Sequence, residues 1–480
     1  MSAPKSLRQS SFRSRMSRTL ASRNVLRGRV GPVPSLGPED DTVEVTPLGM
    51  LETPAITRAS VLQLAGLPSA VRGAAETDTG RSGWTIERVL AERAVEPLFQ
   101  PIVELARLRP VGVEALARGP VGSGLWRARD LFAAAVAAGR LAELDTLCAE
   151  RALETVRAAE APPALVFVNA EPAVVDHPLS PRLRELMSDA PFRMVLEYTE
   201  RALSARPAAL LQLAAAVQAH GHCLALDDVG ADPMSLAFLP LLEPEVVKLD
   251  LQLLRAPHAA RTVDVVAAVN AVAERTGALI VAEGIETPDD LANARALGAH
   301  WGQGLLFGGP APLAGHESTG AHEACGAQAL RASRPGVHLP AGTPFEAAAA
   351  RGKARSATPG LFGAHLEHVL RRAGHEAVVL ATCTDAFTAR SWLPSLTGLA
   401  ARAAFVGMVA PLHPAAVGPG VRFAQRAGAE VEECALVVVA PRYTAAVCGR
   451  GSHAAMEFAH TEDTALVAEM ARIILQQLPR

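Results

Sequence analysis

Four short apolar runs each carry an acid or a lysine close to their carboxyl end, and these runs decide the fold: MVLEYTE (194–200), CLALDDV (223–229), VVKLDL (246–251) and LIVAEG (279–284). Their length and their content of Val, Leu and Ile are typical of buried β-strands. Stretches rich in Ala and Leu with helical patterning separate them. Strands that alternate with helices in this way predict an α/β fold with a parallel sheet.

Working outward from these runs, four further strand-like segments extend the same pattern: LFQPIVEL (98–105), GVEALAR (112–118), LVFVNA (165–170) and WGQGLLF (301–307). Eight strands over about 210 residues favour a (β/α)8 barrel over a sandwich. The first two are only about six residues apart, too few for a crossover helix. We therefore predict a modified TIM barrel whose first strand is antiparallel.

Composition excludes several classes of protein. The 480 residues carry 46 Lys and Arg against 49 Asp and Glu, a net charge of −3, so the chain as a whole has no character of a DNA-binding protein. The sequence contains no apolar run of about 18 residues, the length that a membrane-spanning helix needs, so no membrane span is predicted. The six cysteines occur singly in apolar runs, which indicates reduced thiols in a cytoplasmic protein.

Changes in composition predict the domain organisation. Residues 1–82 are expected to be a disordered basic arm and linker; the first 30 carry eight Lys and Arg and no acid, so a tether to an acidic surface is the alternative. The barrel is expected over 83–312, a linker over 313–342, and a second, smaller α/β domain over 343–480.

The ends of the barrel strands are where catalytic groups gather in such folds. Five carboxylates are predicted at one barrel mouth, and they could not all stay ionised without cations between them. The predicted ligands are oxygen atoms, with no cluster of Cys or His residues, and such ligands select Mg²⁺ or Mn²⁺. Two such ions are suited to a displacement reaction at phosphorus. Lys248 could act on the attacking water, with its pKa lowered by the nearby metal ions. Alternatively, it could simply be the counter-ion of Asp250, which alternation places on the same face of a strand over 246–251. The predicted acids are Glu114, Glu197, Asp227, Asp228 and Glu283.

These motifs resemble a known family. In chain order they are FQPIVEL, VEALAR, NAEP, LEYTE, LDDVG, KLD, VAEGIET and GQGLLFG, and they cover about residues 83–312. Together they are similar to the EAL domain, a phosphodiesterase specific for cyclic di-GMP. The resemblance implies a modified TIM barrel and hydrolysis of cyclic di-GMP to linear pGpG with Mg²⁺ or Mn²⁺.

The resemblance also implies a role for individual residues. Lys248 would act on the nucleophilic water, and Glu286 would orient water or metal. Glu200 would anchor the loop that follows Asp228. The metal ligands would be Glu114, Asn169, Glu197, Asp227, Asp228 and Glu283, and the dinucleotide contacts Gln100, Arg118 and Gln303.

One loop departs from the family pattern. Where relatives usually read DDFGTGYSSL, residues 227–236 read DDVGADPMSL, and Pro233 stiffens the segment. Because this loop normally couples dimerisation to metal occupancy, a cyclic di-GMP receptor with little or no turnover, signalling through protein partners, is the alternative to an active enzyme. A homodimer is the expected assembly.

The C-terminal segment, about 343–477, resembles the DICT domain, a sensory module that accompanies cyclic di-GMP enzymes. The motifs are GTPFE, AFVGMV, PGVRF, LVVVAPRYTAAVCG and MEFAHTEDTALV. The resemblance implies that a small ligand or a protein partner of this domain tunes the barrel. His453 and His460 have no second metal ligand at a suitable spacing and are predicted to be surface residues.

Overall fold

The computed structural model describes residues 83–480 apart from 172–178, 200–205, 231–232, 316–328, 331, 333, 335, 430, 453–454 and 480. For residues 233–235, 251, 452 and 455 it describes the backbone but not the side chains. The predictions for the basic arm and linker (1–82), for Glu200 and for His453 therefore lie outside the described residues. Within the described part, no helix combines the length and the apolar character needed to cross a membrane.

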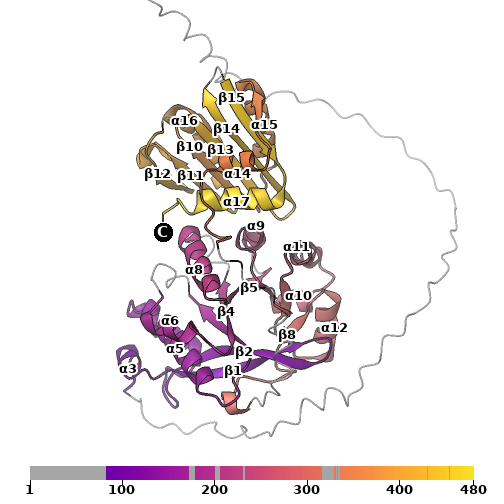
Figure 1. The fold of residues 1–480 in the computed structure, drawn as a ribbon. Coiled ribbons are helices and arrows are strands. Elements are labelled where there is room, and N and C mark those ends of the chain that lie inside the picture. The colour runs from indigo at the N-terminus through magenta and orange to yellow at the C-terminus, as the bar shows by residue number, and fades with distance from the viewer. Residues whose placement is uncertain are drawn as a thin grey trace, which may run out of the picture. The chain divides into compact units, whose positions relative to one another are not determined.

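The first unit of structure is a closed eight-stranded barrel with the strands in sequence order (Figure 1). Strand β1 pairs antiparallel with β2 and with β8, whereas the pairs from β2–β3 to β7–β8 are parallel. The predicted modified TIM barrel with an antiparallel first strand is confirmed. The strands are β1 Glu96–Glu104, β2 Arg109–Arg118, β3 Leu165–Ala170, β4 Arg193–Thr199, β5 Cys223–Val229, β6 Val246–Leu249, β7 Leu279–Ala282 and β8 Trp301–Gln303.

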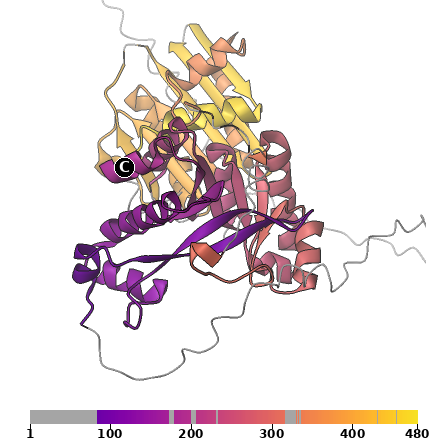
Figure 2. The same cartoon turned by 60° about the horizontal axis from the view of Figure 1, so that its bottom comes forward.

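Helices cover the outside of this barrel. The β1–β2 hairpin is long, and α5 packs along it (Figure 2). The helices are α3 Ile86–Ala91, α4 Ala128–Ala137, α5 Leu141–Arg157, α6 Pro181–Met187, α8 Pro207–Ala219, α9 Pro233–Leu242, α10 Leu251–Arg255, α11 Ala260–Thr276 and α12 Pro288–Ala296, and a 3₁₀ turn, η2 Leu313–Gly315, follows β8.

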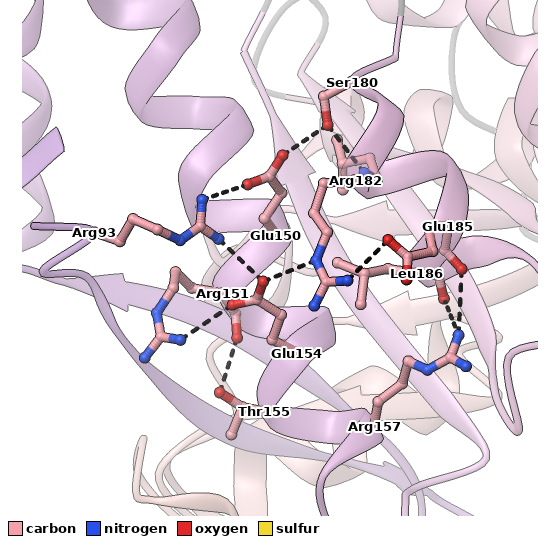
Figure 3. A network of polar contacts seen from close by, with 11 residues as sticks. Arg93, Glu150, Arg151, Glu154, Thr155, Arg157, Ser180, Arg182, Glu185 and Leu186 are labelled. Carbon is pink, nitrogen blue, oxygen red and sulfur yellow. Dashed lines mark hydrogen bonds and ion pairs between the residues drawn. The ribbon is translucent and has the colours of Figure 1, made fainter. Parts of the chain in front are cut away.

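A network of ion pairs ties the outer helices to the start of the barrel (Figure 3). Arg93, in the turn before β1, donates to Glu150 at 2.8 Å and to Glu154 at 3.1 Å, both on α5. Glu150 also accepts a hydrogen bond of 2.7 Å from Ser180, the N-cap of α6. The network thus fixes α5 and α6 against the segment that leads into β1.

The barrel interior is filled by an apolar layer that supports the polar end. Because side chains alternate along a strand, residues two positions apart point into the same interior. The layer is buried to 2% exposure or less, and it consists of Ile102, Phe167, Val195, Ala225, Val246, Val281 and Trp301. Each residue of this layer lies two positions along its strand from a predicted site residue. The site residues reached in this way are Gln100, Asn169, Glu197, Asp227, Lys248, Glu283 and Gln303.

The second unit is a seven-stranded sheet of order β12-β11-β10-β13-β14-β15-β9. Alternation along β10 sends Val379 and Ala381 to a core with α15 and α16, and Val378 and Leu380 to a core with α17. A second α/β fold was predicted here, although β9, β12, β15 and α14 were not. The elements are α14 Pro344–Ala350, β9 Arg355–Ala357, α15 Pro359–Arg372, β10 Val378–Cys383, α16 Ala386–Ala400, β11 Phe405–Ala410, η3 Pro414–Ala416, β12 Val421–Gln425, β13 Glu433–Ala440, β14 Tyr443–Ser452, β15 Ala455–Thr461 and α17 Thr464–Leu475.

Candidate active site

Lys248 is the centre of the polar layer. Its side chain, on β6, is 1% exposed, and its ammonium nitrogen lies among four carboxylates. Nζ is 2.6 Å from Glu283 and 2.8 Å from Glu197, and it is 3.4 Å from both Glu114 and Asp227. These acids lie on β2, β4 and β5 and directly after β7, so the barrel brings together residues that are far apart in the sequence.

The alternative interpretation of Lys248, as the counter-ion of Asp250, is wrong. Asp250 lies beyond the end of β6 and caps α10, where its Oδ1 accepts a hydrogen bond of 2.6 Å from the backbone N–H of Gln252. Side-chain alternation predicted Lys248 and Asp250 on the same face only because the strand was expected to continue to residue 251. It ends at Leu249, and the helix then begins.

Amide side chains hold Glu114 in place from both sides. Asn169 donates to one carboxylate oxygen of Glu114 at 2.8 Å, and Gln303 donates to the other at 2.6 Å. Gln303 also donates to Gln100 at 3.0 Å, and Gln100 donates to the carbonyl of Gly308. Gln100 lies directly opposite Glu114 in the β1–β2 register, so the antiparallel first strand contributes to the site.

A bulge in β5 turns Asp227 and Asp228 toward the same site. Three residue steps from Leu226 to Val229 are paired with only two steps on β6, and Asp228 has a left-handed φ of 57°. Neighbouring residues of a regular strand point to opposite faces, whereas a bulge re-aims one side chain. As a result, Asp227, Asp228 and Glu283 each offer an oxygen within 4.8 Å of the others.

The combined effect of burial and neighbouring charges raises the pKa values of three groups in this site. Burial and the charges of Glu114 and Asp227 raise the pKa of Glu197 well above its ordinary range. Burial, with Asp227 and Glu114 nearby, raises the pKa of Glu283 to about 8 against the pull of Lys248. Burial opposes the charge of Lys248, but the four carboxylates nevertheless raise the pKa of Lys248 well above its ordinary value.

The sequence-based expectation that nearby metal ions lower the pKa of Lys248 stays a prediction, because it concerns the metal-bound site. With the carboxylates as its neighbours, the side chain is held as an ammonium and acts as a hydrogen-bond donor.

The donor set fits hard divalent cations. All candidate ligand atoms are oxygens, and when Glu197 is ionised its buried Oε2 has no hydrogen-bond donor among the described residues. Such an atom is costly to bury unless something binds it. Mg²⁺ and Mn²⁺ prefer carboxylate and amide oxygens, so Glu114, Asn169, Glu197, Asp227, Asp228 and Glu283 could hold such ions.

Two predicted site residues do not join this cluster. Glu286 is exposed and pairs with Arg255 at 3.3 Å. Arg118 is half-buried at the end of β2 and donates to the carbonyl of Ala117 at 2.8 Å. Arg118 does line a cavity of about 270 Å³ beside the cluster, together with Asn169 and Thr199.

Sequence reasoning missed Asp145 in this cavity. It lies on α5 and is 4% exposed. Burial raises its pKa to about 7, although a backbone hydrogen bond from Glu171 lowers it. The signal was present in the sequence, because Asp145 has helical spacing with the apolar residues Ala149, Ala152 and Val156.

The fold and the site define a TIM-like barrel with an acidic mouth built around one lysine. Residues 85–310 match the family model of the EAL domain. The match covers the whole barrel. The resemblance of the C-terminal segment to the DICT domain stays a prediction.

Several known proteins are similar to the barrel part of the chain. The probable cyclic di-GMP phosphodiesterase PdeB of Escherichia coli K12 is 31% identical over 218 residues, which are 44% of this chain and 41% of PdeB. The cyclic di-GMP phosphodiesterase NbdA of Pseudomonas aeruginosa is 35% identical over 123 residues, 25% of this chain and 16% of NbdA. The chain thus spans less than half the length of these relatives.

Among solved structures, a manganese and cyclic di-GMP complex of BlrP1 from Klebsiella pneumoniae is 26% identical. The similarity covers 45% of this chain and 56% of that one, with a TM-score of 0.40.

Proposed function

We propose that the barrel hydrolyses cyclic di-GMP to linear pGpG with two Mg²⁺ or Mn²⁺ ions. The observation that carries the proposal is the cluster of acids around Lys248 at the mouth of an EAL-like barrel. The names of PdeB and NbdA, whose sequences resemble the barrel, supply the substrate.

Charge arithmetic supports the number of metal ions. The five carboxylates of the site carry five negative charges when ionised, and Lys248 returns one positive charge. The four negative charges that remain would be balanced by the four positive charges of two divalent cations. Buried carboxylates stay ionised only when they are compensated in this way.

The reaction needs the chain to position a water molecule and a phosphate. When bound, the two ions would polarise the phosphate and lower the pKa of a water molecule. The water oxygen forms a bond to phosphorus, the bond from phosphorus to the 3′ oxygen breaks, and the leaving oxygen takes up a proton. One water molecule is consumed for each phosphodiester bond opened.

Individual residues have separate roles in this scheme. Lys248, held as an ammonium by its neighbours, orients the water and balances negative charge on the phosphate. Gln100 and Gln303, next to Glu114, contact the dinucleotide, and Arg118 contacts a phosphate through its forked donors. Glu286 orients water only if it releases Arg255, and Glu200 anchors the loop after Asp228.

The remaining parts of the proposal concern the whole chain. A homodimer, regulation by the C-terminal segment through a ligand or a protein partner, and a cytoplasmic location are proposed from the sequence resemblance. The domain limits at 83–312 and 343–480 belong to the same proposal.

The test is direct. Purified protein is incubated with cyclic di-GMP and Mg²⁺ or Mn²⁺, and pGpG is followed by chromatography. We expect turnover that Glu114→Ala and Lys248→Ala abolish, that Ca²⁺ suppresses, and that Glu143→Ala on the exposed face of α5 leaves unchanged. Tight binding of cyclic di-GMP without any product would overturn the proposal.

A further inference from the structure

The chain that leaves β5 after Asp228 packs on the corner between α10 and α11. Gly230 is the first residue beyond the strand, and it has a positive φ of 105°. A Cβ added at Gly230 would lie 2.7 Å from a methyl carbon of Leu253 on α10 and 3.1 Å from one of Val265 on α11. The backbone at this point is therefore in direct contact with both helices.

Arg261 holds the same segment through a backbone carbonyl. Its side chain, in the first turn of α11, donates from Nη2 to the carbonyl oxygen of Gly230 at 3.0 Å. The preceding carbonyl, that of Val229, accepts a hydrogen bond of 3.4 Å from the backbone N–H of Asp250. Two successive carbonyls are thus held in place, and one of the two donors is a side chain that can be replaced.

The position of Arg261 in its own helix is unfavourable. α11 begins at Ala260, its first turn contains no acidic residue, and its N-cap, Ala259, makes no side-chain capping bond. The N-terminal end of a helix carries a partial positive charge, so a cation is destabilising there and stabilising at the other end. A contact outside the helix can offset this cost, and the hydrogen bond to Gly230 is such a contact.

The start of α11 is fixed firmly enough to act as a support. Thr262, the neighbour of Arg261, is 3% exposed, and its hydroxyl donates to the carbonyl of Ala256 at 2.8 Å. Ala256 is the C-cap of α10, so this bond joins the two helices at their corner. Arg261 therefore projects from a part of the barrel that is itself held in place.

The metal ligands of β5 depend on the position of this segment. Asp228 has a φ of 57°, an uncommon conformation for a residue other than glycine, which the surrounding structure must stabilise. Gly230 is two residues after Asp228 and three after Asp227, so the position of its carbonyl limits the positions open to both carboxylates. Their oxygens lie within 4.8 Å of each other and of an oxygen of Glu283 in this arrangement.

We propose that Arg261 is a positioning residue for Asp227 and Asp228, and that it acts through the carbonyl of Gly230. The inference rests on the proposed function, because it takes these two carboxylates as ligands of divalent ions. The direction of the effect separates positioning from simple charge. The positive charge of Arg261 repels a cation, so removing the charge alone would tighten metal binding. A positioning role predicts weaker binding.

The test measures Mn²⁺ binding by the full chain, with free Mn²⁺ followed by electron paramagnetic resonance. We expect Arg261→Gln to bind Mn²⁺ about three- to tenfold more weakly than the wild type, as for the loss of one hydrogen bond. Arg261→Lys keeps the charge and one donor nitrogen and should recover part of the affinity. Arg184→Gln, which removes an exposed arginine of α6, should bind as the wild type does.

A second measurement needs no metal. In EDTA, hydrogen–deuterium exchange over residues 226–230 should be faster in Arg261→Gln than in the wild type and unchanged in Arg184→Gln, and circular dichroism checks that both variants are folded. Unchanged exchange, or Mn²⁺ binding by Arg261→Gln that equals or exceeds that of the wild type, would overturn this inference alone. A wild type that binds no Mn²⁺ would overturn the proposed function together with it, so the two failures are distinguishable.

Discussion

The ammonium of Lys248 lies 2.6 Å from a carboxylate oxygen of Glu283, and this ion pair joins the ends of two neighbouring strands inside the barrel. Three more acids surround the same nitrogen. A single buried cation therefore compensates part of a much larger negative charge.

Replacing Lys248 by Met should destabilise the protein when divalent ions are absent. Removing one partner of a buried ion pair leaves uncompensated charge and costs about 3 kcal/mol or more. Denaturation by urea in the presence of EDTA at pH 8 measures the loss, which should shrink at lower pH because the acids can then be protonated. The exposed Lys353→Met is the control, and an equal effect of the two variants would contradict the prediction.

Divalent ions should stabilise the wild-type protein through the acids of β5 and β7. A ligand that binds only the folded state at a hundred times its Kd adds about 2.7 kcal/mol. We expect Mn²⁺ to raise the midpoint of thermal unfolding, and Asp227→Asn/Asp228→Asn to remove most of that increase. Asp289→Asn, an exposed residue in the first turn of α12, should respond to Mn²⁺ as the wild type does. No response of the wild type to Mn²⁺ would refute a metal site here.

Asp145 should make stability fall as the pH rises. Its pKa in the folded protein is about 7, compared with an ordinary value of 3.8, so the folded chain keeps a proton that the unfolded chain releases. The free energy of unfolding should therefore decrease between about pH 4 and pH 7 and level off above, by a few kcal/mol at most, since one pKa unit corresponds to about 1.4 kcal/mol. Asp145→Asn should lack this decrease.

The pH series needs an exposed aspartate for comparison. Asp130→Asn, on the neighbouring helix α4, should follow the wild-type curve when urea denaturation is repeated from pH 5 to pH 8. If Asp145→Asn also follows the wild-type curve, the carboxyl of Asp145 is not held protonated in the folded state.

Glu150 should contribute more to stability than an exposed member of the same network (Figure 3). Its side chain is 9% exposed, and both of its oxygens accept a hydrogen bond, from Arg93 and from Ser180. Glu150→Gln should cost about 1–3 kcal/mol, because the amide group of the buried glutamine would face a donor where Glu150 offers an acceptor. Glu185→Gln, whose side chain is 69% exposed, should cost less than about 1 kcal/mol by urea denaturation. Equal costs would show that burial is not what makes Glu150 important.

Much of the barrel could be predicted from the sequence. The apolar runs of strand length, the helices between them and the short first connection are all local features of the sequence. They were sufficient to predict the number and order of the strands and the antiparallel orientation of β1. Period-two alternation was also sufficient to place Glu114, Glu197, Asp227, Lys248 and Glu283 at one mouth. The match of residues 85–310 to the EAL domain agrees with this prediction.

The detailed contacts could not be predicted because they depend on register, on where elements end and on packing between distant segments. The bulge that brings Asp227 and Asp228 together arises from the pairing of β5 with β6, and the pairing of Glu286 with Arg255 depends on where α10 lies. His365 and His460 are 95 residues apart and meet only because α15 packs on the sheet that contains β15. The sequence by itself determined the kind of fold and the residues available at its mouth, and the tertiary structure decided which of those side chains touch.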